Sequence, residues 1–232
     1  MEILRETVDW FLDPAHWAGS NGVPWRLGEH VFFSVVAILL AVAVSLPAGL
    51  AIGHTRRGDR IATAVAGLGR AVPSYALLIL FVPFLGLGFS SALPALVLLA
   101  IPPILLNTVA GIQDVDRDTI EAGRGMGMTE RQVLRDVELP AALPAIIVGL
   151  RTSAVQVVAT ATLAALVAGG GLGRYIVDGF ALQQDDRLLA GAILVAVLAL
   201  GTDRAFTWAQ RRYERGGLSE PEGRETLVRQ AL

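Results

Sequence analysis

Few residues of this chain have the type and spacing that catalysis or metal binding requires. Its three histidines, His16, His30 and His54, are scattered, and none has a carboxylate or another histidine at ligand spacing. The absence of cysteine excludes disulfides and thiolate metal sites. We therefore predict no metal site and no cofactor.

Nucleotide chemistry is also missing. A phosphate-binding loop of the type G-x-x-x-x-G-K-[ST] needs its lysine, and the chain contains no lysine. Ser34, Ser45, Ser74 and Ser153 have no base nearby in the sequence, which leaves open only a hydrolase assembled in space. We predict that the chain is not an enzyme, that energy from ATP comes from another polypeptide, and that nucleic acid is not a partner.

The charged stretch EAGRGMGMTERQVLRDVELP, residues 121–140, interrupts a run of apolar segments. Before it, Asp116 or Asp118 can cap a short helix that is expected to end near Met126. We predict that this segment is helical and that its charged side chains stay outside, available to a partner. The alternative is a well-capped loop that packs on its own bundle.

A turn and a second helix are expected within that stretch. Gly127 suits the position just past a helix end, where φ is positive. Thr129 with Gln132 three residues later matches a capping box, which starts a helix. That helix is expected to end before Pro140. The segment therefore reads as helix, glycine turn, helix.

The elements around this segment are those of a membrane protein. The chain is 53% hydrophobic and 17% charged, with a mean hydropathy of +0.57. A helix needs about 20 apolar residues to cross a ~30 Å hydrocarbon core. We predict an all-α integral membrane protein with five transmembrane helices, within residues 30–52, 61–87, 92–112, 144–167 and 188–208.

Two of these spans contain features that disturb a helix. The second carries Arg70, Pro73 and Pro83, so its membrane part is expected to be short and partly broken. The third is expected to be kinked at Pro102 and Pro103, because proline removes a backbone donor.

Arginine predicts the orientation, because basic residues near span ends favour the cytoplasmic side. With five spans, three arginine-rich segments fall on one side: 54–60, 114–140 and the tail after residue 203. The first 29 residues hold two arginines against five acids. We predict that the N-terminus is outside and the C-terminus inside, in a multi-pass protein of a bacterial plasma membrane.

The two ends of the chain are expected to flank residues 29–213, the transmembrane domain. Residues 1–28 lack a signal-peptide pattern, and their apolar residues and tryptophans predict either a short helix in the outer interface or a loosely ordered lead-in. Membrane lipid is thus an expected partner. The polar segment 214–232 is expected to be a disordered cytoplasmic tail.

The charged stretch resembles a known motif. Glu121, Ala122 and Gly123, followed by Gly127 and the pair at residues 139–140, are similar to the EAA loop of permease subunits in bacterial binding-protein-dependent ABC importers. Glycine at position 123, where the motif has alanine, weakens the local helix by roughly 0.5–1 kcal/mol and leaves room for close packing.

The likeness extends over roughly residues 30–212. Residues 101–180 and AVPSYALL at 71–78 are similar to permeases of the glycine betaine, carnitine and choline uptake systems, with the phrases RGMGMT, TATLAAL and GGGLG. The resemblance implies a MetI-like fold that pairs with two ATPase subunits, a second permease, identical or related, and an extracytoplasmic solute-binding protein. It implies that the loop seats on the ATPase through Glu121, Ala122, Gly123, Met126, Gly127, Met128 and Thr129.

Candidate pathway residues are small or polar. Gly149, Ser153, Gln156 and Thr160 recur on one helical face, which either lines the pathway or lets helices approach closely. Asn107 has the same two interpretations. Because the spans hold few aromatic residues for cation–π contacts, selectivity for quaternary amines is expected mostly in the binding protein.

Other span residues suggest a gate and an ion pair. The glycine-rich segment 163–176 permits a sharp external re-entry, with Leu163 and Val167 as candidate gate residues. Arg151 is expected to extend toward the cytoplasmic headgroups, and Asp203 to form an ion pair across helices. An ion-coupled transporter or channel that uses these two residues, and a scaffold without transport, remain as alternatives.

Overall fold

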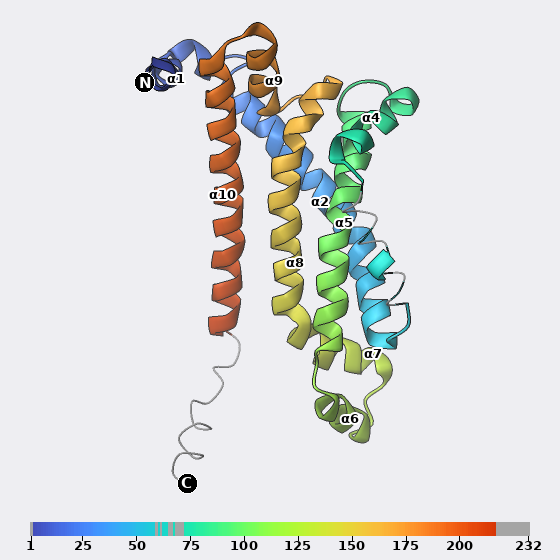
Figure 1. Cartoon of the computed structure of the whole chain (residues 1–232). Coiled ribbons are helices and arrows are strands. Elements are labelled where there is room, and N and C mark those ends of the chain that lie inside the picture. Colours follow the sequence, from blue (N-terminus) through green and yellow to red (C-terminus); the bar gives the residue numbers. More distant parts are fainter. Residues whose placement is uncertain (1, 59, 61, 65–66, 68–71, 217–232) are drawn as a thin grey trace.

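The computed structural model describes residues 2–58, 60, 62–64, 67 and 72–216, and every regular element in these ranges is helical (Figure 1). α1, α9 and α4 lie at one end of the bundle, and α6 and α7 lie at the other, here called the loop end. In chain order the elements are α1 (Glu2–Leu12), η1 (Pro14–Trp17), α2 (Val23–Thr55), α4 (Ser74–Leu85), α5 (Phe89–Gln113), α6 (Arg117–Gly125), α7 (Glu130–Gln132), η2 (Val133–Glu138), α8 (Leu139–Thr160), η3 (Ala161–Val167), α9 (Gly173–Leu182) and α10 (Asp185–Gly216).

Among the described residues, four helical segments are long and apolar enough to cross a membrane, one fewer than the five expected. They are α2, α5, the continuous run Glu130–Val167 and α10. The expected second span is represented by α4, which has 12 residues, too few to cross alone. Residues 59, 61, 65–66 and 68–71, including Arg70, lie outside the described part. Among the described residues, the expected five transmembrane helices are therefore four long helices and the short α4, which takes the place of the second span, itself expected to be short and partly broken.

Small residues bring the first two long helices together. A Cβ added at Gly49 would lie 2.7 Å from Thr108 Cβ, and one added at Gly53 would lie 2.7 Å from Ile112 Cβ. The contacts advance in the same direction along both chains, so α2 and α5 run parallel. Helices in membranes often pack through glycine, because lipid is as apolar as the side chains and close van der Waals contact must hold the helices together.

α8 packs antiparallel on α5 and completes the core. Gly149 touches Asn107, and Gly111 at the far end of α5 touches Ala145. The buried cluster where the three helices meet also includes Ala161 of η3 and consists mostly of small residues: Ala37, Ala41, Leu96, Ala100, Ile104, Val157 and Ala161.

The helix after the glycine turn does not end before Pro140, contrary to the sequence prediction. Helical structure is continuous from Glu130 through α8. η2 is a π-helix, in which the amide of Leu139 donates to the carbonyl of Leu134. This i→i−5 bond widens the turn that precedes Pro140, so the proline is accommodated within a continuous helical run.

α1 is a docked helix and not a loose lead-in. Trp10 is buried in a cluster with Val23, Leu172 and Tyr175, and its ring meets that of Tyr175 edge-on at 5.3 Å. The Tyr175 hydroxyl donates to the carbonyl of Asn21 (2.6 Å), and burial raises the pKa of this phenol. At the other terminus α10 continues to Gly216, so residues 214–216 of the expected disordered tail are helical, and residues 217–232 lie outside the described part.

Candidate functional site

The loop predicted to couple to an ATPase, residues 114–140 and here called the coupling loop, begins with a capped helix. The Asp116 side chain accepts the amide of Asp118 (3.3 Å) and the hydroxyl of Thr119 (3.1 Å), which confirms Asp116 as one of the two predicted caps. α6 then runs to Gly125, one residue short of the predicted end at Met126.

Gly127 ends that helix in the predicted conformation. Its φ is +85°, its amide donates to the carbonyl of Arg124 (2.9 Å), and the amide of Met128 donates to the carbonyl of Gly123 (3.2 Å). This pair of bonds is the Schellman motif, which satisfies carbonyls left over at a helix end. The predicted capping box also forms, and the Thr129 amide donates to Gln132 Oε1 (2.8 Å).

An ion pair spans the turn. Arg124 donates to both carboxylate oxygens of Glu130, at 3.0 and 2.9 Å. This hydrogen-bonded carboxylate raises the pKa of the Arg124 guanidinium. Both side chains are exposed, so water and salt weaken the attraction, and the pair serves mainly to orient the turn.

The loop has its own small core and leaves a projecting outer surface. Val115, Ile120 and Val133 are buried together, with Met128 packed against them. Gly123 is also buried, and a Cβ there would lie 3.1 Å from Met128 Sδ, so the departure from the alanine of the motif coincides with close packing. The remaining residues predicted to couple are exposed: Glu121, Ala122, Met126, Gly127 and Thr129. Met126 is an apolar side chain that the described part of the chain leaves 78% exposed.

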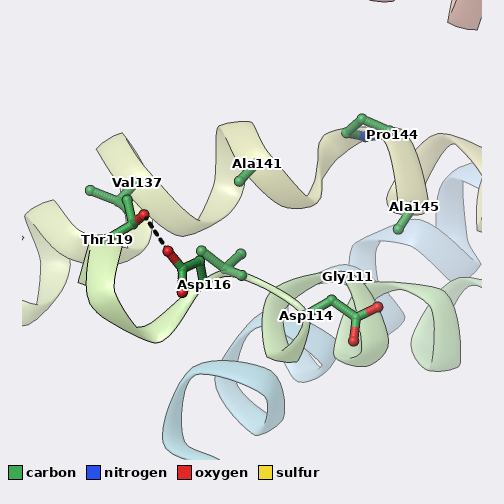
Figure 2. Close-up of a pocket in the computed structure, with 9 residues that line it drawn as sticks. Gly111, Asp114, Asp116, Thr119, Val137, Ala141, Pro144 and Ala145 are labelled. Atoms are coloured by element: carbon green, nitrogen blue, oxygen red, sulfur yellow. Dashed lines mark hydrogen bonds between the residues drawn. The ribbon is translucent and has the colours of Figure 1, made fainter. Parts of the chain in front are cut away.

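A cavity of about 430 Å³ lies between the start of the loop and α8. Figure 2 shows Asp116 and Thr119 joined by their hydrogen bond on one side, with Ala141, Pro144 and Ala145 on the opposite helix. The Asp116 carboxylate is engaged as a helix cap, and most of the lining is small and apolar. No group of three His, Asp or Glu side chains suited to a metal occurs among the described residues.

The structure separates the predicted pathway residues into two environments. Asn107 and Gln156 line a cleft of about 230 Å³ between α5 and α8, together with Thr152, Pro102 and Pro103. Ser153 is fully buried instead, and its hydroxyl donates to the carbonyl of Ala100 (3.1 Å). Ser153 therefore holds α8 against α5, whereas Gln156, three residues later, faces the cleft. Thr160, the last residue of α8, is half-buried.

The predicted gate residues lie where η3 meets α4. Val167 is buried with Leu78, Ala92 and Ala95, and Leu163 packs against this cluster. The amide of Gly88 donates to the carbonyl of Val167. The predicted gate segment, residues 163–176, is thus held by apolar contacts and by the turn between α4 and α5.

Sequence reasoning missed the residues that hold the other side of this segment. Glu29 accepts the amide of Gly171 (2.8 Å), and the buried His30 accepts the amide of Leu172 at Nδ1 (3.3 Å). His30 Nε2 lies 2.9 Å from the carbonyl of Val158, so both ring nitrogens are satisfied. The only sequence feature that could have pointed to these residues is the acidic and basic pair Glu29 and His30 at the start of the first span. Their partners, 142 residues away, follow only from the fold.

Arg151 and Asp203 form an ion pair between α8 and α10. Arg151 donates to both carboxylate oxygens, at 2.6 and 3.0 Å. This confirms the prediction that Asp203 pairs across helices. The Arg151 side chain has a partner in the bundle, so the expectation that its guanidinium extends to the headgroups is replaced by this pairing.

Comparison with known proteins identifies the family. Residues 31–215 match the family described as "Binding-protein-dependent transport system inner membrane component". The chain is 37% identical over 194 residues to the glycine betaine/carnitine/choline transport system permease protein OpuCB of Bacillus subtilis, covering 84% of this chain and 89% of the relative. It is 42% identical over 178 residues to the carnitine transport permease protein OpuCB of Listeria monocytogenes, covering 77% and 82%.

A further relative and a solved structure point to the same family. The chain is 33% identical over 206 residues to the osmoprotectant import permease protein OsmW of Salmonella typhimurium, covering 85% of this chain and 92% of the relative. A solved structure of the MetNI methionine ABC transporter in an inward-facing conformation superposes with a TM-score of 0.73 at 22% identity, over 82% of this chain and 95% of that one. This likeness shows the fold, which is the predicted MetI-like one. The chain therefore belongs to the binding-protein-dependent transport family, as a multi-pass permease of the bacterial inner membrane.

Proposed function

We propose that the chain is the permease subunit of an ATP-driven importer of small quaternary ammonium solutes such as glycine betaine, carnitine or choline. It forms the translocation pathway with a second permease subunit and receives substrate from an extracytoplasmic binding protein. Two separate ATPase subunits supply the energy. The observation that carries this proposal is the coupling loop, a braced helix–turn–helix that projects from one end of the bundle (Figure 1).

The exposed surface of the loop is the proposed seat of the ATPase. Glu121 offers a charge and Met126 an apolar side chain, on either side of a helix end whose geometry is set by Gly127. The internal core around Val133 makes the loop a rigid body, and a rigid body can pass a displacement to the spans.

The parallel packing of α2 and α5 supports a fifth crossing and the arginine-based orientation. Both helices end near the loop end, so the chain between them has to return. Ala62 shares a buried cluster with Leu105 and Val109, and Leu78 shares one with Ala92 and Ala95. These positions are about 20 Å apart along α5 at ~1.5 Å per residue. We infer a crossing between residues 62 and 85, with the N-terminus outside and the loop in the cytoplasm.

The cleft at Asn107 and Gln156 is the proposed part of the pathway, with Leu163 and Val167 as its outer gate. None of the described residues that line the cleft is aromatic. A quaternary amine would therefore find no cation–π cage there, which assigns recognition to the binding protein and passage to the cleft.

Reconstitution tests the proposal. In proteoliposomes that hold the permease, its ATPase and its binding protein, we expect uptake to require ATP hydrolysis. Glu121→Lys should abolish uptake and reduce co-purification of the ATPase. Asp136→Lys makes the same charge change at an exposed position outside the proposed surface and should leave both near the wild-type level. Normal uptake by Glu121→Lys would contradict the proposed role of the loop.

The same vesicles test the ion-coupled alternative. Arg151 and Asp203 neutralise each other in a two-bond pair, which gives neither residue an evident role in carrying an ion. Uptake driven by an ion gradient in vesicles without the ATPase would favour the alternative and overturn the importer.

A further inference from the structure

His54, at the loop end of α2, contacts two carboxylates that belong to the segment after the glycine turn. Its Nδ1 lies 2.6 Å from Glu138 Oε2, and its Nε2 lies 3.3 Å from Glu130 Oε2. One imidazole ring therefore bridges α2 to α7 and to η2. An imidazole that carries protons on both nitrogens donates to both carboxylates.

The two contacts differ in their surroundings. Glu138 is 3% exposed, and a carboxylate removed from water needs a charged or hydrogen-bonding partner, which His54 supplies. Glu130 is exposed, and it also receives the two bonds from Arg124. The result is a continuous polar chain, Arg124–Glu130–His54–Glu138, from α6 to the start of α8.

The backbone joins α8 directly to the loop but does not join α2 to it. α7 continues through η2 into α8 without a break, so α8 follows any movement of the loop through the backbone. α6 and α7 pack mainly against η2. α2 is distant in sequence from the loop, so a displacement reaches it through contacts between elements. These are its packing on α5, the hydrogen bond from the Arg56 side chain to the carbonyl of Gln113 (3.1 Å), and the His54 bridge.

We propose that His54 is a positioning residue that ties the coupling loop to the first span, so that α2 and α8 move together when the ATPases displace the loop. The inference rests on the proposed function of the loop. It predicts that loss of His54 uncouples ATP hydrolysis from uptake and leaves binding of the ATPase intact, because His54 lies behind the proposed docking surface.

The experiment compares uptake per ATP hydrolysed in the reconstituted complex. His54→Asn places an amide nitrogen near the position of Nδ1, so it keeps a donor for Glu138 and loses the contact with Glu130. Glu130→Ala removes the same contact from the solvent side, where folding tolerates change. Arg124→Ala removes only the brace across the turn, and Thr55→Ala changes an exposed neighbour whose hydroxyl bonds its own helix.

We expect His54→Asn and Glu130→Ala to lower uptake per ATP by at least about fivefold. This factor corresponds to the lower end of typical coupling free energies between sites. His54→Asn should co-purify with the ATPase at the wild-type level, and Glu130→Ala should co-purify at the level of Arg124→Ala, which lacks the same brace. Thr55→Ala should behave as wild type. A loss with Glu130→Ala that Arg124→Ala reproduces in full would assign the effect to the brace and overturn the role of His54.

Wild-type uptake per ATP in either His54→Asn or Glu130→Ala would also overturn it. These failures differ from failure of the proposed function. In that case, the unmodified complex itself would take up substrate without ATP, or would not take it up at all.

Discussion

The turn at Gly127 permits a quantitative test of the coupling loop. With φ at +85°, this residue occupies the left-handed region, and nothing lies within 4 Å of the position that a Cβ would take. Alanine at this position therefore meets backbone strain without a steric clash. The left-handed conformation costs an L-residue roughly 1–2 kcal/mol.

That strain sets the expected effect. If the whole strain acts on the turn, it lowers the ratio of loops with the native turn to loops without it about 5- to 30-fold. The apparent dissociation constant of the ATPase rises by the inverse of the fraction of loops competent to bind. We therefore expect Gly127→Ala to weaken ATPase binding by up to about 30-fold. Gly127→Asn should weaken it less, because asparagine tolerates this region better.

Gly125 is the matched control. It is the last residue of α6, it also has open space around its Cα, and its φ is not positive. Alanine is preferred to glycine in a helix by roughly 0.5–1 kcal/mol, so Gly125→Ala should bind the ATPase as well as wild type or better. The assay is titration of the purified ATPase onto permease in nanodiscs. Equal affinities for the three variants would refute the argument that the turn geometry presents the docking surface.

Two further predictions concern the bundle. Gly49→Ala brings a Cβ to 2.7 Å from Thr108 Cβ and should lower the melting temperature of the protein in detergent, because overpacking costs about 1–3 kcal/mol. In Gly28→Ala, on the same helix, the added Cβ meets nothing within 4 Å, so the melting temperature should stay unchanged or rise. Equal melting temperatures for the two variants would contradict the close packing of α2 on α5. Asp203→Ala should reduce the amount of folded protein in the membrane, because Arg151 loses its partner. Replacement of both residues by leucine should restore the amount of folded protein. A wild-type amount of the single variant would show that the pair is not needed for folding.

Local signals predicted the loop well. The positive φ of Gly127, the cap at Asp116 and the box at Thr129 each depend on a residue and its near neighbours, and each is confirmed. Pro140 shows the limit of that reasoning. Proline argues for a helix end, but the π turn before it keeps the helix continuous, and no short-range pattern announces a π turn.

The second span shows the same limit. Hydropathy locates apolar residues without showing how a broken segment folds, so residues 61–87 read as one span whereas the described part holds the short helix α4. The periodicity of α8 likewise placed Ser153 and Gln156 on one face. Packing on α5 assigned Ser153 to the interface and Gln156 to the cleft.

By itself the sequence determined that this is a membrane protein that lacks the lysine of a phosphate-binding loop and has a capped, charged loop that turns at Gly127, because composition and turn residues can be read locally. The tertiary structure alone decided which distant polar groups meet. Glu29 and His30 find amides on the gate segment, Arg151 finds Asp203, and His54 finds Glu138. Each of these side chains lies in or beside an apolar bundle, where a polar group needs a partner, and only the packing of the helices specifies which partner is within reach.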